Sequence, residues 1–104
     1  MKVLTEGHLY ELANFENKEA EGQKIQFIHK VAVIGGGTDT QTVSDGTTNE
    51  EVIEMMIDRM NHLQSKFPCR ENALAITKLE ESLMWLNKRT ADRIKRQVEG
   101  KYHI

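Results

Sequence analysis

The stretch that decides the fold is residues 53–86, which read IEMMIDRMNHLQSKFPCRENALAITKLEESLMWL. Apolar side chains recur at intervals of three and four residues on both sides of Pro68, which indicates two amphipathic helices that each bury one face. Pro68 cannot continue a helix, so the two helices should form an antiparallel hairpin with a tight corner. The expected contact rows are Ile53, Met56, Met60, Leu63 and Phe67 on the first helix, and Ile76, Leu79, Leu83, Leu86, Thr90 and Ile94 on the second.

The ends of both helices have recognisable signals. Thr48 and Glu51 have the spacing of a capping box, which predicts that the first helix opens there. The second helix should begin at residues 70–71 and run to about Val98, with Gly100 supplying the left-handed residue that ends it.

The hairpin carries more apolar surface than one partner helix can cover. Several apolar side chains lie outside the contact rows and would stay exposed in a single hairpin. We therefore expect copies of the chain to associate and cover them. They are Val52, Met55, Leu74, Met84 and Trp85.

The residues before the hairpin predict a small antiparallel sheet. Residues 8–15 and 24–34 are rich in aromatic and branched side chains, and a third short strand is expected at 40–44. Such a sheet is too small to be stable alone. The predicted fold is therefore α+β, with a small antiparallel β region over residues 1–46 and a long antiparallel helical hairpin over residues 47–104, together forming one compact domain.

One face of the predicted strand at 24–34 is almost wholly apolar and should be buried. That face holds Ile25, Phe27, His29, Val31 and Val33. The glycines at 35–37 that follow are interpreted as a hairpin tip, because no Gly-Lys-Ser/Thr and no helix start come after them, as a phosphate-binding loop would require.

Composition excludes several classes of protein. The chain has 104 residues, of which 38% are hydrophobic and 29% charged, and no apolar run approaches the roughly 20 residues that a membrane span needs. The N-terminal residues lack the apolar segment of a secretion signal, so we expect a cytosolic protein. Cys69 is the single cysteine and the four histidines lack ligand spacing, so neither a disulfide, a metal site nor a cofactor is expected.

Positive charge collects near the C-terminus. Residues 1–58 hold 4 Lys and Arg against 11 Asp and Glu, whereas residues 88–101 hold 6 against 2. Arg89, Arg93 and Arg96 are spaced so that they lie along one side of the last helical turns, where their planar guanidinium groups suit phosphate oxygens. A solvated helix end is the alternative, since the helix dipole favours cations there.

The remaining chemistry favours recognition over catalysis. His62 and Cys69 have no third group to orient them, and Glu80 and Glu81 point about 100° apart on a helix. Trp85 and Phe67 either stack on a nucleotide base or pack in the core.

Several short sequence motifs of this chain, in fixed order, closely resemble those of a known family. The motifs are Phe67-Pro68-Cys69-Arg70-Glu71-Asn72, Leu79-Glu80-Glu81-Ser82-Leu83-Met84-Trp85-Leu86, Arg89-Thr90-Ala91-Asp92-Arg93 and Val98-Glu99-Gly100. They resemble the helical hairpin of the phage counter-defence family that contains Thoeris anti-defence protein 1 and anti-CBASS protein 2. The resemblance covers roughly residues 47–104, and the strands before it are more like the Thoeris branch.

The resemblance implies a sponge in the cytoplasm of an infected bacterium. Members sequester cyclic ADP-ribose isomers or cyclic di- and trinucleotides without degrading them, as homo-oligomers from dimers up to hexamers whose pockets lie between protomers. It implies no enzymatic activity and no membrane or nucleic-acid partner. The positions that it carries into ligand contact are Arg89, Thr90, Arg93 and Gly100, followed by Phe67, Arg70 and Asn72. Two further candidates come from the residues themselves, Arg96 from its spacing and Trp85 from its ability to stack on a base.

Two other functions remain open on sequence. A nucleic-acid-binding module would use the same basic helix end and would show steep salt dependence, although the acidic first half of the chain opposes it. A purely structural oligomerisation module would bind no small ligand at all.

Overall fold

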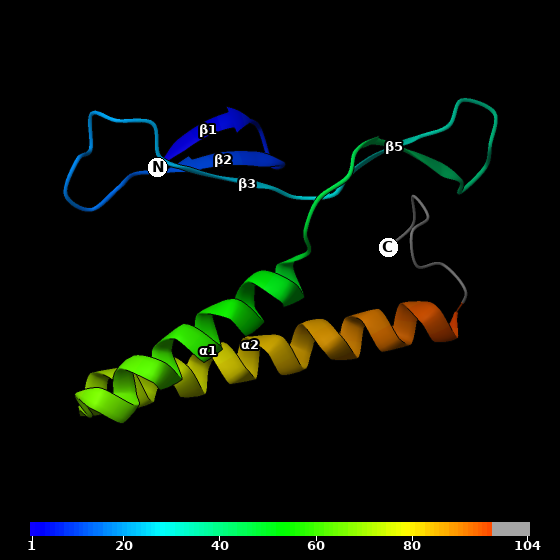
Figure 1. Cartoon of the computed structure of the whole chain (residues 1–104). Helices are drawn as coiled ribbons and strands as arrows, with labels where there is room; N and C mark the ends of the chain where they lie inside the picture. The colour runs from blue at the N-terminus through cyan, green and yellow to red at the C-terminus, as the bar shows by residue number, and fades with distance from the viewer. Residues whose placement is uncertain (97–104) are drawn as a thin grey trace. The chain divides into compact units, whose positions relative to one another are not determined.

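A computed structural model describes residues 1–96 and confirms an α+β fold in which antiparallel strands precede a helical hairpin (Figure 1). The described chain divides into two compact units, residues 1–48 with all the strands and residues 49–96 with both helices. In chain order the elements are β1 (Lys2–Thr5), β2 (Leu9–Leu12), β3 (Gln23–Gln26), β4 (His29–Ala32), β5 (Thr40–Ser44), α1 (Asn49–Lys66) and α2 (Arg70–Lys95).

The strands form two antiparallel sheets instead of the single sheet expected. The first sheet has the order β1-β2-β3, with Tyr10 of β2 opposite Val3 on one side and Ile25 on the other. The second sheet pairs β4 with β5. Strand β1 was not predicted from the sequence.

The predicted strand at 24–34 is interrupted at Phe27 and Ile28, where Gly46 and Thr47 pass alongside. The N–H of Thr47 donates to the carbonyl of Gln26 at 2.8 Å, and its carbonyl accepts from Ile28 at 2.9 Å. A side chain at Gly46 would collide with the backbone of Gln26 and Phe27, so only glycine allows this approach. This crossing directs β3 and β4 into different sheets.

Aromatic side chains link the two sheets. The rings of His8, in the turn before β2, and His29, at the start of β4, stack with centroids 3.7 Å apart. Tyr10 meets Phe27 edge to face at 5.9 Å between centroids. The N–H of Phe27 also donates to the carbonyl of His8 at 2.7 Å, so the same residues hold the junction through backbone and rings.

The apolar face expected to be buried is only half-buried. Ile25, Phe27, His29 and Val33 are partly covered, and Val31 is exposed. No residue within 1–48 is fully buried. With strands of only four or five residues, this unit has too little apolar surface for a core of its own.

The glycines at 35–37 do form the tip between β4 and β5. Gly35 and Gly37 have positive φ values of 76° and 64°, which other residues rarely adopt. The loop is closed by the N–H of Val33, which donates to the carbonyl of Asp39 at 3.1 Å.

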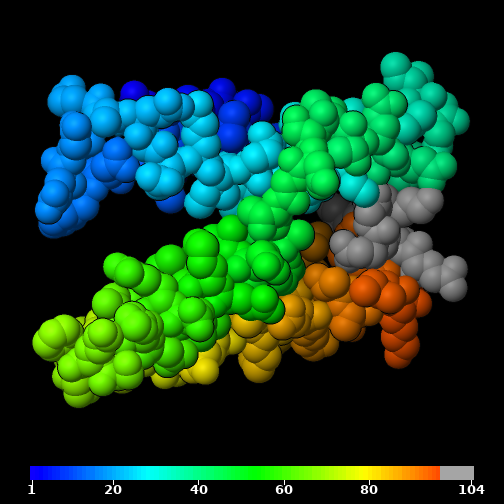
Figure 2. Space-filling model, viewed as in Figure 1, coloured from blue at the N-terminus to red at the C-terminus, as the bar shows by residue number. Residues whose placement is uncertain are grey.

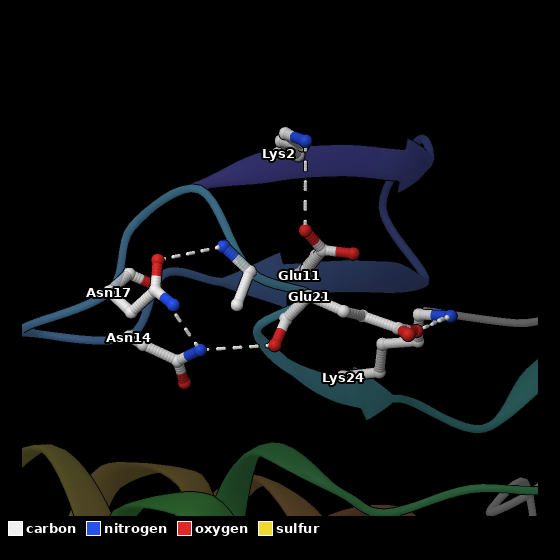
Figure 3. A network of polar contacts seen from close by, with 7 residues as sticks. Lys2, Glu11, Asn14, Asn17, Glu21 and Lys24 are labelled. Atoms are coloured by element: carbon white, nitrogen blue, oxygen red, sulfur yellow. Dashed lines mark hydrogen bonds and ion pairs between the residues drawn. The ribbon is translucent and has the colours of Figure 1, made fainter.

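The loop between β2 and β3 is held by polar contacts within itself (Figure 3). The side-chain amide of Asn14 donates to the carbonyl of Glu21 at 3.0 Å, and the Asn17 side chain accepts from the N–H of Ala20 at 3.2 Å. At the end of the loop, Lys24 forms an ion pair with Glu21 at 2.7 Å. These contacts give the loop a fixed shape without a hydrophobic core.

Helices α1 and α2 lie side by side and form the expected antiparallel hairpin (Figures 1 and 2). α1 ends before Pro68 as predicted, but its last residue is Lys66, so Phe67 is not part of the helix. α2 begins at Arg70 as predicted but ends at Lys95, with Arg96 as its C-cap, three residues earlier than expected. The predicted stop at Gly100 lies outside the described residues.

Helix α2 has one row of covered side chains, which follow one another at alternating intervals of four and three residues. Ile76 is buried at 8% exposure and Arg93 at 5%, and the others are half-buried. Ile94 was expected in this row but is exposed. The row continues three residues after Thr90, at Arg93, and not four residues after it, at Ile94. The row is Asn72, Ile76, Leu79, Leu83, Leu86, Thr90 and Arg93.

The covered row of helix α1 has similar spacing, but two of its predicted members are wrong. Ile53, Met60 and Leu63 are half-buried as predicted, but Met56 and Phe67 are exposed. Phe67 lies beyond the helix end and Met56 is one position out of phase with the steps from Ile53 to Met60. The positions that replace them in the covered row are Ile57 and Gln64.

Most of the surplus apolar side chains are indeed exposed in the single chain. Met55, Leu74, Met84 and Trp85 are each about half accessible or more, whereas Val52 is half-buried.

Candidate ligand-binding site

The last turns of α2 present a basic surface beside an aromatic side chain. Arg89 and Arg96 are exposed, and Trp85, one turn before Arg89, is 57% exposed. Residues four and seven apart lie within about 40° of one another around a helix, so these three side chains share one strip along α2. A flat ring next to two guanidinium groups offers stacking and phosphate contacts together.

Arg93 lies differently from its two neighbours. The spacing argument grouped all three arginines, but Arg93 is almost fully buried while the others face solvent. At 5% exposure its guanidinium is covered together with the aliphatic stem. The side chain of Arg93 is therefore less accessible to a ligand than those of Arg89 and Arg96.

Thr90 takes part in the contact between the two helices. It is half-buried, and its Oγ1 donates to Oε1 of Glu50 in the first turn of α1 at 3.3 Å. Thr90, which was predicted as a ligand-contact position, thus donates its hydroxyl across the hairpin. Glu50 was not singled out from the sequence, although its place in the covered row of α1 would have suggested a partner.

An ion pair at this end of α2 joins side chains of the same helix. Lys88 pairs with Asp92 at 3.3 Å, one turn further along α2. Within residues 1–96 Arg89 has no ion pair. The basic last turn of α2 is also favoured by the helix dipole, so charge alone does not prove a binding site.

The second group of predicted residues lies at the corner of the hairpin. Phe67 is 78% exposed, Arg70 is exposed and Asn72 is half-buried. Cys69 is the N-cap of α2, and its Sγ accepts the N–H of Asn72 at 3.4 Å. Gly100, the remaining predicted position, lies outside the described residues.

The two groups stand at opposite ends of one helix. α2 has 26 residues and is about 39 Å long, so Asn72 and Thr90 lie about 27 Å apart along its axis. The structure therefore brings Trp85, Arg89 and Arg96 together, and Phe67 and Arg70 together, but does not join the two groups within one chain.

One residue of the corner was missed altogether. Gln64, in the last turns of α1, binds both backbone groups of Cys69 through its side-chain amide. A polar residue in an otherwise apolar row, a few positions before the proline, was the available signal.

Neither a metal site nor a membrane span is found in the described part of the chain. Residues 1–96 contain no group of three His, Cys, Asp or Glu side chains placed to hold a metal ion. Both helices there are also too polar to cross a bilayer.

Comparison with known proteins assigns the family. Residues 29–91 match the Acb2/Tad1 hairpin domain, so the chain belongs to this family. The match runs from β4 through most of α2 and includes the corner, Trp85 and Arg89, while Arg93 and Arg96 follow it.

The chain is also similar to the protein named Thoeris anti-defense 1 of Bacillus phage SBSphiJ7. The two are 58% identical over 65 residues, which make up 62% of this chain and 46% of the relative. The chain thus spans less than half the length of that relative.

Proposed function

We propose that the chain binds a cyclic nucleotide signal of bacterial immunity and sequesters it unchanged, as an anti-defence sponge of a phage in the cytoplasm of its host. Isomers of cyclic ADP-ribose are the first ligands to expect, followed by cyclic di- and trinucleotides. Membership in the Acb2/Tad1 hairpin family and similarity to a protein named Thoeris anti-defense 1 support this proposal.

The observation that carries the proposal is the strip formed by Trp85, Arg89 and Arg96. An exposed indole can stack on an adenine ring, and each guanidinium can bind phosphate oxygens through two parallel hydrogen bonds. A cyclic nucleotide presents a base and phosphates within one small rigid molecule, so its chemistry matches the strip.

The distance between the two groups of predicted residues favours a pocket shared by protomers. Phe67 and Arg70 lie at the far end of α2 from Arg89 and Arg96. A small ligand cannot bridge about 27 Å along one helix. A second copy that brings its corner to the basic end of the first would complete an enclosing site, which fits a homo-oligomer.

Sequestration requires affinity and no bond cleavage. Stacking, phosphate contacts and exclusion of water from an enclosed pocket supply affinity. The residues gathered in the strip are two permanent cations and an indole, and none of them exchanges protons near neutral pH. The bound nucleotide should therefore be recovered intact.

Charge reversal in the strip tests the proposal. Arg89→Glu and Arg96→Glu should each weaken binding of a cyclic ADP-ribose isomer by about 10- to 100-fold in calorimetry, because a charge-assisted hydrogen bond contributes about 1.5–3 kcal/mol. Arg93 is unsuitable for this test because it is buried and its reversal would disturb packing. The matched control is Arg59→Glu, on the exposed surface of α1.

The same samples separate the rival functions. Light scattering should show the same assembly mass for all variants, and chromatography after heat denaturation should return the ligand unaltered. Cleaved ligand would indicate an enzyme, and tight binding of long DNA that weakens steeply with salt would indicate a nucleic-acid module. Unchanged affinity in both strip variants would refute the assigned site, and no uptake by the wild-type protein would leave only a structural role.

A further inference from the structure

The corner of the hairpin is held by a single side chain from α1. The Oε1 atom of Gln64 accepts the N–H of Cys69 at 3.1 Å, and its Nε2 donates to the carbonyl of Cys69 at 3.0 Å. One amide thus binds both backbone groups of one residue, as a neighbouring β-strand would. The contact spans the proline and ties the end of α1 to the start of α2.

Other bonds complete the fixation of Cys69. Its carbonyl also accepts the N–H of Ala73 at 3.2 Å as the first bond of α2, and its Sγ accepts the N–H of Asn72. On the other side of Pro68, the N–H of Phe67 donates to the carbonyl of Leu63 at 2.9 Å. The backbone from Phe67 to Asn72 is therefore anchored on both sides of the proline.

The side chains that this backbone carries are free to meet a ligand. Phe67 is 78% exposed and Arg70 is exposed, so neither is used for packing within the chain. A ring and a guanidinium three residues apart bind one ligand together only when the backbone between them has one fixed path. Gln64 fixes that path without itself lying in the exposed pair.

We propose that Gln64 is a positioning residue, whose amide holds the Phe67–Arg70 corner so that its aromatic ring and its guanidinium engage the base and the phosphate of one cyclic nucleotide. This inference rests on the proposed function and adds a residue of α1 that touches no ligand. Loss of the Gln64 amide should weaken ligand affinity. A corner with several conformations binds ligand only through the fraction of chains that are in the binding-competent conformation.

Gln64→Met is the direct test, because methionine keeps the length and helix preference of the side chain and removes both hydrogen bonds. Calorimetry with a cyclic ADP-ribose isomer should show about tenfold weaker binding. Amide hydrogen exchange, followed by NMR, should accelerate at least about tenfold at Cys69 and stay unchanged at the buried Ile76. This local signature distinguishes positioning from a general loss of packing.

Two further variants make the experiment decisive. Asn61→Met, one turn earlier on the exposed side of α1, should keep wild-type affinity and wild-type exchange at Cys69. If Gln64→Met fails to fold, Gln64→Glu replaces it, since the carboxylate still accepts from Cys69 N–H but repels the Cys69 carbonyl. Because that variant keeps one of the two hydrogen bonds, its faster exchange at Cys69 and its loss of affinity should both be smaller than those expected of Gln64→Met.

The outcomes separate this inference from the function on which it rests. Affinity within twofold of wild type in Gln64→Met overturns the positioning role while the sponge stands. Faster exchange at Ile76 in step with Cys69 also overturns it, because the lost affinity would then reflect unfolding. Absence of binding by the wild-type protein refutes the proposed function first, and the positioning role with it.

Discussion

Thr90 and Arg93 lie at the end of α2 where the ligand is expected, yet both serve the packing of the chain. Thr90 donates to Glu50 across the hairpin, and Arg93 is one of two buried residues within 1–96. Arg89 and Arg96, on the neighbouring strip, face solvent. We therefore expect substitutions at the first pair to change stability, and substitutions at the second pair to change the proposed binding.

Thr90→Val should destabilise the protein by about 1 kcal/mol in urea unfolding. Valine keeps the β-branched shape but removes the hydrogen bond to Glu50, whose half-buried carboxylate then loses a donor. The effect is measured as a lower urea midpoint at constant slope.

Thr77→Val provides the comparison. The Thr77 hydroxyl is exposed and donates to the carbonyl of Ala73 in its own helix at 3.1 Å, so its loss should change stability by no more than about 0.5 kcal/mol. Equal effects at both positions would show that the Glu50 contact contributes nothing.

The loop between β2 and β3 depends on polar contacts, and one of them is visible as a shifted pKa. The hydrogen bond from Lys24 and its positive charge hold the pKa of Glu21 below the ordinary value of 4.5. The same contact raises the pKa of Lys24 above 10.5. The stabilisation from the pair is therefore complete between these two ordinary values. It is lost as the pH falls through the lowered pKa of Glu21 or rises through the raised pKa of Lys24.

Lys24→Met should return the pKa of Glu21 upward toward its ordinary value. Carboxyl carbon shifts followed by NMR across acidic pH measure this directly. Lys18→Met, in the same loop, is the control and should leave the Glu21 titration unchanged. An identical Glu21 curve in wild type and Lys24→Met would mean that the ion pair does not persist in solution.

The helices were predictable because their signals are local. Apolar spacing and Pro68 located both helices and the corner, and the errors at Met56 and Ile94 arose because neighbouring apolar residues compete for one row. The residue that fills the row on α2 is a cation, Arg93, which apolar spacing cannot select.

The strands were less predictable because their boundaries are set by distant residues. Residues 24–34 are uniformly suited to a strand, and the interruption comes from Gly46 and Thr47, which approach from about twenty positions later. For the candidate site, residue spacing placed Arg89 and Arg96 on one side of the helix but also included Arg93, which is buried. The contact made by the Gln64 amide depends on the path of the corner in space, which spacing does not give.

Many large apolar side chains within residues 1–96 are exposed. Ile76, at 8% exposure, is the one buried apolar residue within residues 1–96, while Leu74, Met84 and Trp85 on α2 are exposed. A chain of this kind gains stability by covering these side chains against another copy.

We therefore expect light scattering to give a mass at least twice the 11.9 kDa of one chain. Leu74→Lys combined with Met84→Lys should shift the mass toward that of one chain, because two cations would have to be buried in the contact. Asn61→Lys, at an exposed position of α1, controls for added charge. A single-chain mass of the wild-type protein at all concentrations would contradict the expected self-association.

The two hydrogen bonds of Gln64 also limit the number of residues that the corner can contain. Surface loops usually accept extra residues, because nothing in them depends on an exact spacing. One residue inserted after Pro68 would move Cys69 by about 3.5 Å, beyond reach of the amide that now binds its N–H and carbonyl. Insertions and deletions at this turn should accordingly be far less tolerated than those at the glycine tip between β4 and β5.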